Sequence, residues 1–426
     1  NTYIINSSTS DAPASFSVAK NENILWTMDL PEGGQSGISV IGDKIFLSIL
    51  KPVSQEDWQK DNRGSKNRKD IVGLCIDTKT QKILWQKELK GSISGPSLYS
   101  FSDASTPTPV ADEKHVWFFA ASGAIACLDH SGKLVWEYHW QPIDKLGKVH
   151  FPFNKQFEPL ISGDLIYNVE PYTKKDGKRT YGWNYIFAYD KLSGARKWIS
   201  EDALTHYNTP FISKSFTGKN AILIGRGGHH RVPEKPAGYS MIDAQSGKSL
   251  WQYKDKEYSL YNSCFNDKYA IRMSEKGYLN VLKSSDGTLI KKISLNENVD
   301  ALIYDSAQKK LVEHRALNLG KEKKTVFPAW FSNILIGDQL YFMCFEAGRY
   351  KKNAGPKHSF ARVDLISGKV QYLQVPTSMD GQTKIYNESI LSSTKNHRGF
   401  EIDGDKRSRR DGWHWLFNGN PIAVNG

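Results

Sequence analysis

The chain has 426 residues, a formal net charge of +12 and a pI of about 9.2. This length allows two or three ordinary domains or one large all-β domain, and the positive charge favours an anionic partner. Apart from the runs at 66–69 and 406–410, the basic residues are scattered, and the chain carries no helical basic region, zinc finger or RNA-binding signature. We therefore expect no nucleic acid partner, and the absence of a long apolar run predicts no transmembrane segment.

A short pattern recurs along the chain and predicts its architecture. Five segments end in tryptophan: Ile24-Leu25-Trp26, Ile83-Leu84-Trp85, Leu134-Val135-Trp136, Arg196-Lys197-Trp198 and Ser249-Leu250-Trp251. Most follow a turn that begins with Asp and ends with Gly, as in 129–132, 190–194 and 243–247, and a further such turn at 364–368 lacks the tryptophan. Between these turns lie short alternating or apolar runs, which are typical of β-strands joined by tight hairpins.

A repeated unit of four strands and about 40 to 60 residues indicates a propeller blade. Residues 105–140 show it most clearly, with the runs STPTPVA, HVWFFAA, AIACLD and KLVWEY separated by turn residues. The pattern resembles the quinoprotein-like propeller repeat, which quinone-dependent alcohol dehydrogenases and outer-membrane assembly scaffolds share. It predicts six complete antiparallel blades, at roughly 34–88, 95–139, 155–200, 209–254, 261–294 and 326–374.

The two ends of the chain predict a seventh blade. Ile24–Leu30 looks like a fourth strand without partners, and Asn418–Asn425 looks like a first strand. Together they would close a seven-bladed all-β propeller and remove the exposed edges of an open ring. The middle strands of this blade have no match, so either the native chain continues past Gly426 or the blade is truncated. We expect one domain over 1–426, with an insertion at about 300–325 that does not fit the repeat.

The blade geometry sorts the candidate functional residues. Connections between blades and those between the second and third strands open on one face, while the remaining turns open on the other. Loops on a rigid scaffold often carry function, and the first face receives these residues: His139, His150, His206, Tyr207, Arg226, His229 and Tyr261. His115 and His130 fall on the other face and are interpreted as structural. The alternative for each single residue is a packed side chain with one hydrogen bond.

A His, Tyr and Arg cluster of this kind resembles the active site of seven-bladed ulvan lyases of polysaccharide lyase families 24 and 25. The resemblance implies that Arg226 neutralises a uronate carboxylate while Tyr207 and His150 transfer protons, with the base left open between them. His130 fits a second family histidine by spacing, but its predicted face favours His139 instead. We expect an anionic polysaccharide substrate, bound with the help of His139, His206, His229, Tyr261 and Trp183.

The same lyases carry a structural zinc ion, and three residues here could hold one. Cys344 lies on a predicted strand of the sixth blade, His358 lies across the following loop, and His314 lies in the insertion. A cysteine with two histidines suits zinc. We therefore expect a structural zinc that ties the insertion to the sixth blade, held by at least two of His314, Cys344 and His358.

Three other functions were weighed. A non-enzymatic scaffold of the assembly-factor type would use the same repeat and would not need the His, Tyr and Arg cluster. A quinone-dependent dehydrogenase has eight blades and an adjacent cysteine pair, which this chain lacks, so we expect no quinone. A nucleic-acid binder has only the charge in its favour.

The ends and the cysteines carry expectations about the cellular setting. The sequence begins at Asn1 without a methionine or a hydrophobic leader, which favours a mature exported protein, secreted or periplasmic, whose signal peptide has been removed. Cys75, Cys127, Cys264 and Cys344 form no CxxC pair, and we expect them to be small buried residues. We expect a monomer.

Overall fold

The computed structural model describes most of the repeat region and little of the two ends. The contacts divide the chain into two compact units, which are treated one at a time: 28–260 with 285–287, and 2–27 with 261–284 and 288–426. Side chains at 171, 173–183, 304, 326–328, 344–346 and in the two terminal strands are not described. The described ranges are 4–5, 21–54, 56–57, 68–92, 103–140, 158–176, 179–204, 209–227, 237–256, 263–274, 277–305, 307–308, 310–319, 326–328, 333–346, 359–374 and 423–424.

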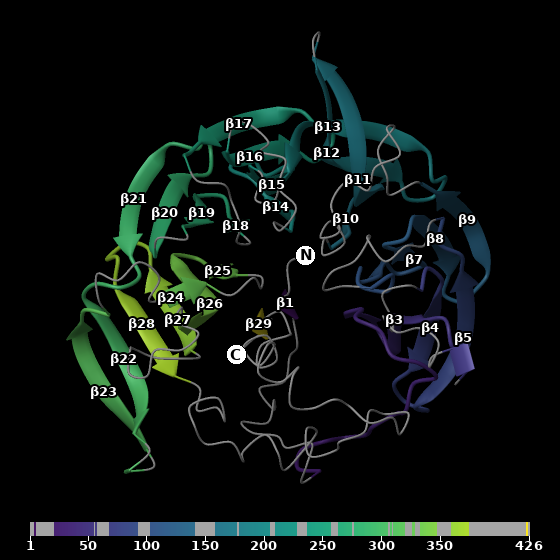
Figure 1. Ribbon diagram of the computed structural model, residues 1–426, viewed down its shortest axis with the longest axis horizontal. Coiled ribbons are helices and arrows are strands. Elements are labelled where there is room, and N and C mark those ends of the chain that lie inside the picture. Colours follow the sequence, from purple (N-terminus) through teal and green to yellow (C-terminus); the bar gives the residue numbers. More distant parts are fainter. Residues whose placement is uncertain are drawn as a thin grey trace. The chain divides into compact units, whose positions relative to one another are not determined.

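The first unit contains four antiparallel sheets of four strands each, and the strands of each sheet follow chain order. Figure 1 shows the first strands β10 and β14 on the inner side of their sheets and the fourth strands β5, β9 and β17 on the outer side. The sheets are β2 (Ile38–Ile41), β3 (Lys44–Leu50), β4 (Ile71–Asp77) and β5 (Lys82–Leu89); β6 (Val110–Ala111), β7 (His115–Ala120), β8 (Ala124–Asp129) and β9 (Leu134–His139); β10 (Leu160–Ser162), β11 (Leu165–Asp176), β12 (Arg179–Asp190) and β13 (Arg196–Leu204); and β14 (Phe211–Lys214), β15 (Asn220–Arg226), β16 (Gly238–Asp243) and β17 (Ser249–Lys254).

The middle strands of the second and third sheets are buried on both faces, because each of these sheets packs between two others of the same unit. In β7, Phe118 belongs to the core cluster shared with Phe46 of β3, whereas Trp117 and Phe119 belong to the cluster shared with Phe187 of β12. Successive side chains of a strand point to opposite faces, so one strand contributes to two cores. This explains why the middle runs of the repeat are continuously apolar rather than alternating.

The repeated tryptophan of one sheet packs on the repeated glycine of the next. A methyl group added to Gly194 would lie 2.8 Å from the ring of Trp136, and the backbone of this glycine has a φ of +71°. Glycine is therefore required both for space and for the left-handed backbone. The same contact occurs at four places along the chain: Trp85 on Gly132, Trp136 on Gly194, Trp198 on Gly247 and Trp251 on Gly287.

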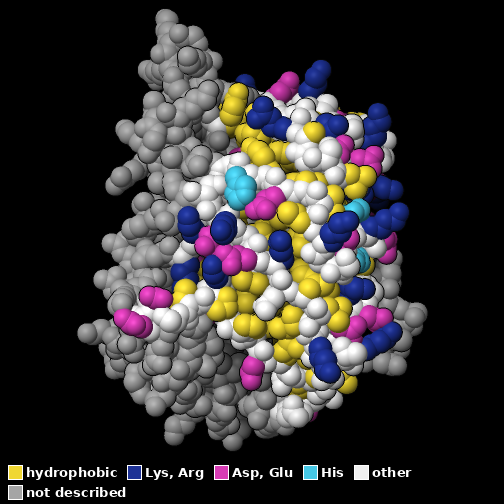
Figure 2. Space-filling model, turned by 90° about the vertical axis from the view of Figure 1, so that its right-hand side faces the viewer, with side chains coloured by type: hydrophobic (Ala, Val, Ile, Leu, Met, Phe, Trp, Pro, Cys, Tyr) yellow, Lys and Arg dark blue, Asp and Glu magenta, His cyan; other side chains and the backbone are white. Residues whose placement is uncertain are grey.

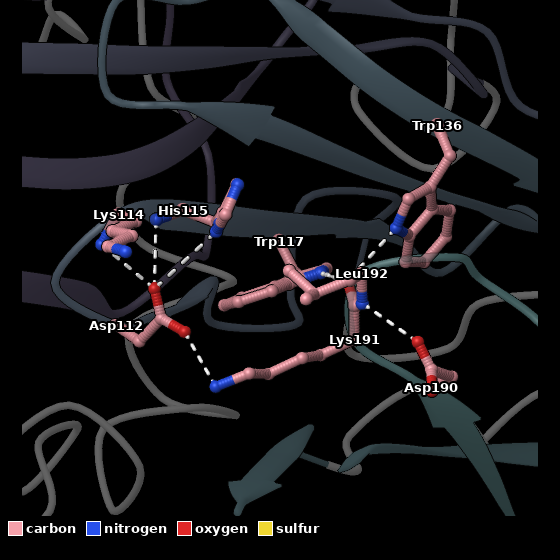
Figure 3. Close-up of polar contacts among 8 residues, drawn as sticks. All are labelled: Asp112, Lys114, His115, Trp117, Trp136, Asp190, Lys191 and Leu192. Carbon is pink, nitrogen blue, oxygen red and sulfur yellow. Dashed lines mark hydrogen bonds and ion pairs between the residues drawn. The ribbon is translucent and has the colours of Figure 1, made fainter. Parts of the chain in front are cut away.

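Polar contacts reinforce the junction between the second and third sheets, as Figure 3 shows. The indole nitrogens of Trp117 and Trp136 both donate to the carbonyl oxygen of Lys191, at 2.9 and 3.0 Å. The ammonium group of Lys191 lies 2.9 Å from a carboxylate oxygen of Asp112. Hydrogen bonds from the backbone of Lys114 and His115 and from Lys191 hold the pKa of Asp112 below its usual value, although partial burial opposes them.

The second unit contains one four-stranded sheet and one seven-stranded sheet. The first is built from β18 (Cys264–Phe265), β19 (Tyr269–Met273), β20 (Tyr278–Lys283) and β21 (Leu289–Ser294). The second contains the sixth repeat together with the insertion: β22 (Val299–Asp305), β23 (Lys310–Leu317), β24 (Val326–Pro328), β25 (Ile334–Ile336), β26 (Gln339–Glu346), β27 (Ser359–Asp364) and β28 (Val370–Gln374). The expected four-stranded antiparallel blades are therefore confirmed for five repeats, and the sixth is extended.

The insertion forms a hairpin that lengthens the sixth sheet. Its strand β22 pairs in parallel with β28, with Ala301 opposite Tyr372, and antiparallel with β23. An ion pair of 2.8 Å between Lys369 and Asp300 joins the hairpin to the residue directly before β28. The predicted break in the repeat near residue 300 thus corresponds to an added edge on the sheet.

The N-terminal part of the predicted closure is wrong. Ile24–Leu30 forms no strand, and Leu25 is 91% exposed. Among the described residues, no strand pairs with this segment. The C-terminal strand β29 (Ala423–Val424) pairs instead, in parallel, with β1 (Ile4–Ile5). The count of seven blades and the closure of a ring remain predictions.

Candidate functional site

Arg226 ends β15, at the glycine-rich connection that the sequence singles out. The sequence predicts a guanidinium that points out of the strand end toward a ligand, and the catalytic role of Arg226 remains a prediction. The residue is 5% exposed, and its Nη1 lies 2.7 Å from Oδ1 of Asp202 in the neighbouring sheet. The guanidinium of Arg226 is thus paired with a buried carboxylate of the protein itself.

Two further side chains hydrogen-bond to this ion pair. Arg226 donates from Nη1 to the hydroxyl of Ser240 on β16, at 3.2 Å, and Gln252 of β17 donates to Oδ1 of Asp202 at 2.8 Å. A buried charge is expensive unless it is paired and hydrogen-bonded. The cluster therefore ties the end of β13 to three strands of the next sheet, within the first unit.

A second buried ion pair lies at the same type of connection, in the first two sheets. Arg68, just before β4, donates to Glu32, just before β2, at 2.8 Å, and both side chains are under one tenth exposed. Nearby, the carboxylate of Asp103 accepts from the backbone and hydroxyl of Ser105, at 2.9 and 2.6 Å. Burial raises the pKa of Asp103 even though these hydrogen bonds lower it. Gln35 accepts a further hydrogen bond from the Asp103 amide.

A third polar group lies inside the third sheet. The hydroxyl of Tyr189 donates to Glu170 at 2.6 Å, and the amide of Asn168 donates to the same oxygen at 3.0 Å. Burial, followed by the Glu170 charge, raises the pKa of Tyr189, so this phenol stays protonated. The ring of Tyr138 of β9 packs at a tilt against Tyr189, with 5.2 Å between the ring centres. The arrangement holds protons in place and exposes none of them to a substrate.

The other candidate residues are distributed as follows. His139 is the last residue of β9 rather than part of a loop, and its Nε2 lies 2.9 Å from Glu137. Trp183 lies on β12 opposite Tyr172, with only its backbone described. His150, His206, Tyr207, His229 and Tyr261 lie outside the described residues. The structure thus brings none of the described candidates to Arg226, and the catalytic assignment of His150 and Tyr207 remains a prediction.

Two of the expected zinc ligands, His314 and Cys344, lie on strands that are far apart in the sixth sheet. His314 lies on β23 and Cys344 on β26, with β22, β28 and β27 between them. Four inter-strand spacings of about 4.8 Å separate those strands by roughly 19 Å, whereas two ligands of one zinc ion lie about 4 Å apart. No cluster of three metal-binding side chains occurs in the part of the chain that the structure describes. Zinc at Cys344 and His358 remains a prediction, since His358 lies outside that part.

Sequence reasoning missed the acids that neutralise the buried arginines. Asp202 and Glu32 lie in segments of mixed composition that carry no motif. No regular sequence spacing connects them to Arg226 or Arg68. The available signal was their position: each lies near a sheet end that opens toward a between-blade connection. Because a buried arginine needs a partner, a search for acids at those ends would have found both.

Within the described ranges, no helix is both long and apolar enough to span a membrane. Similar solved structures include a europium-containing methanol dehydrogenase (12% identity, TM-score 0.46, covering 88% of this chain and 77% of that one). They also include BamB from Moraxella catarrhalis (14%, 0.40, 76% and 70%) and a quinohemoprotein alcohol dehydrogenase from Comamonas testosteroni (14%, 0.43, 80% and 60%). No curated protein matches the chain significantly.

A family model gives the firmer assignment. The model described as outer membrane protein assembly factor BamB matches residues 15–174 and 68–259, overlapping ranges that together cover more than half of the chain. None of the proteins named above is described as a polysaccharide lyase, so the resemblance to ulvan lyases finds no support. The chain belongs to the propeller-repeat family of the outer membrane protein assembly factor BamB.

Proposed function

We propose that the chain is a non-enzymatic propeller scaffold that binds other proteins during their assembly. The family description, an outer membrane protein assembly factor, supports this function. It also supports the secreted or periplasmic location expected from the sequence. Fold alone does not fix function, so the proposal depends on what the described residues can do.

The observation that carries the proposal is the pairing of Arg226 with Asp202. In β-elimination on a uronate, an arginine must neutralise the substrate carboxylate as the transition state forms. Arg226 is 5% exposed, and its charge already neutralises a carboxylate of the protein. The pair joins two neighbouring sheets, and this contact supports a structural role for Arg226 and with it the scaffold function.

The outer strands of the first unit favour contacts with proteins. Leu84 on β5, Val135 on β9 and Leu250 on β17 each expose between 45% and 48% of their surface. Figure 2, which views the side of the molecule where β5 and β9 lie, shows hydrophobic side chains spread between charged ones. Each of these residues stands directly before the repeated tryptophan of its sheet, and this recurrence of an exposed apolar residue supports a surface for protein contacts.

Two measurements test the proposal together. Incubation with ulvan is expected to produce no ultraviolet absorbance of an unsaturated uronate, with a known ulvan lyase as the positive control. A photo-crosslinking residue at Val135 is expected to trap a discrete protein in envelope extracts, while the same residue at Phe216, which is also exposed, traps none. Uronate product that disappears in the Arg226→Lys variant would overturn the proposal.

A further inference from the structure

The hairpin of β11 and β12 is longer than the sheet to which it belongs. The two strands pair continuously from Leu165 opposite Asp190 to Asp176 opposite Arg179. The inner strand β10 pairs only as far as Tyr167, and the outer strand β13 pairs only from Asn184 onward. Figure 1 shows the pair reaching past the rest of its sheet. We call residues 172–176 and 179–183 the arm.

The base of the arm is fixed to the core of the sheet. The ring of Tyr172 packs edge-on against Tyr185 at 5.9 Å and against Phe187 at 6.0 Å. One step below, Glu170 is 3% exposed and accepts hydrogen bonds from Tyr189 and Asn168. A two-stranded hairpin is only marginally stable by itself, so these contacts explain how the arm keeps its strand conformation.

The arm has open strand edges. Among the described residues, the strands of the arm pair with each other and with no third strand. An edge of this kind presents backbone N–H and C=O groups to a further strand. Five residues on each side match the usual length of a strand, about 5 to 6 residues. Only a polypeptide continues such a hydrogen-bond ladder, which favours a protein partner over a polysaccharide, a nucleic acid or a lipid surface.

The positive charge of the arm indicates the charge of the partner segment that would bind it. Residues 174–179 contain four basic residues and a single acid, Asp176. A second copy of the arm would bring like charges together, and lysine on an edge strand is a common protection against such self-pairing. An acidic strand would instead be attracted to the arm, because its carboxylates and the basic residues of the arm have opposite charges.

From the open edge and the charge together, we propose that the arm docks an acidic, extended segment of a partner protein by strand addition. Strand addition of this kind derives affinity from backbone hydrogen bonds and specificity from side chains. The inference rests on the proposed scaffold function, and it assigns one docking element to it. Lys174, Lys175 and Arg179 supply the attraction, and the backbone of the arm supplies the ladder.

The test uses a labelled synthetic peptide of roughly ten alternating Glu and Thr residues, long enough for one added strand. Fluorescence anisotropy is measured with the full chain and with the arm variant Lys174→Glu/Lys175→Glu/Arg179→Glu. The matched control is Lys214→Glu/Lys219→Glu/Lys248→Glu, which reverses three exposed lysines of the fourth sheet. We expect the arm variant to weaken binding roughly tenfold or more, and the control to change it little.

A second peptide separates strand addition from simple charge attraction. The same sequence with methylated backbone nitrogens keeps every carboxylate and loses its backbone donors, so we expect it to bind much more weakly. Equal binding of both peptides, or arm-dependent binding of anionic vesicles in place of the peptide, would overturn the inference. If the arm variant binds the peptide as tightly as the wild type, the docking role of the arm is overturned and the scaffold function still stands. Turnover of ulvan would instead overturn the scaffold function.

Discussion

The ring of Trp136 lies against Gly194, a residue of the next sheet, so closely that a methyl group on that glycine would be 2.8 Å from the ring. Tryptophan and glycine therefore belong to one contact although they come from successive repeats. The repeat is thus a unit of stacking as well as of sequence. Where the sixth repeat has Gly368, the preceding sheet offers Ile293 at 3.9 Å in place of a tryptophan.

Substituting Gly194 with alanine is expected to destabilise the protein by about 2 to 4 kcal/mol. The left-handed backbone accounts for about 1 kcal/mol of this, and the forced displacement of the Trp136 ring for about 1 to 3 kcal/mol. Gly218→Ala is the matched control, because Gly218 has a similar φ of +75° and open space around it. Urea unfolding of both variants measures the difference, and equal losses would show that the contact with Trp136 contributes nothing.

Asp190 predicts a dependence of stability on acid. Hydrogen bonds from the backbone and hydroxyl of Ser193, followed by Lys197, hold the pKa of Asp190 at about 2. The unfolded chain has a value of about 3.9. A lowered folded pKa stabilises the protein above pH 4 and loses that effect as pH falls toward 2.

The Asp190→Asn variant removes this linkage. Its melting temperature is expected to fall by a few degrees at pH 7 and to change less than that of the wild type between about pH 4 and pH 2. Melting curves across this range provide the measurement. If wild type and variant lose stability in parallel below pH 4, other carboxylates carry the acid dependence.

The buried cysteines are expected to be unreactive in the folded protein. Burial raises the pKa of Cys75 to about 11 and that of Cys127 to about 12, and it also raises the pKa of Cys264. The thiolate is the reactive form. Titration with a thiol reagent at pH 8 is therefore expected to label none of these three until urea is added. Rapid labelling of Cys127 in the native protein would contradict its burial.

The blades could be predicted because they form through short-range interactions between residues that are close in the sequence. Alternation, the Asp-to-Gly turns and the tryptophans specify strands, hairpins and the stacking contact, as the 190–194 turn shows. The closing strand at Ile24–Leu30 was mispredicted because its residues fit a strand, while strand formation depends on a partner elsewhere in the chain. Pairing across long separations leaves no local pattern.

The site was harder to predict for a related reason. Arg226 was found from its glycine-rich surroundings, but its role depends on Asp202, which is contributed by another sheet. His314 and Cys344 suggested zinc by their chemistry, and only the strand order shows that they are far apart. Residue type indicates what a side chain can do, and the fold decides what it meets.

The central claim is that the charge of Arg226 serves the fold through Asp202. A double-mutant cycle with Arg226→Met, Asp202→Asn and the combined variant tests it most directly, with urea unfolding at constant pH as the measurement. Each single change leaves an uncompensated buried group and is expected to cost about 3 to 5 kcal/mol. The combined variant is expected to lose less than the sum, with a coupling energy of roughly 1 to 3 kcal/mol. Additive losses within about 0.5 kcal/mol, or a fully stable Arg226→Met variant, would contradict the claim and leave the arginine free for a ligand.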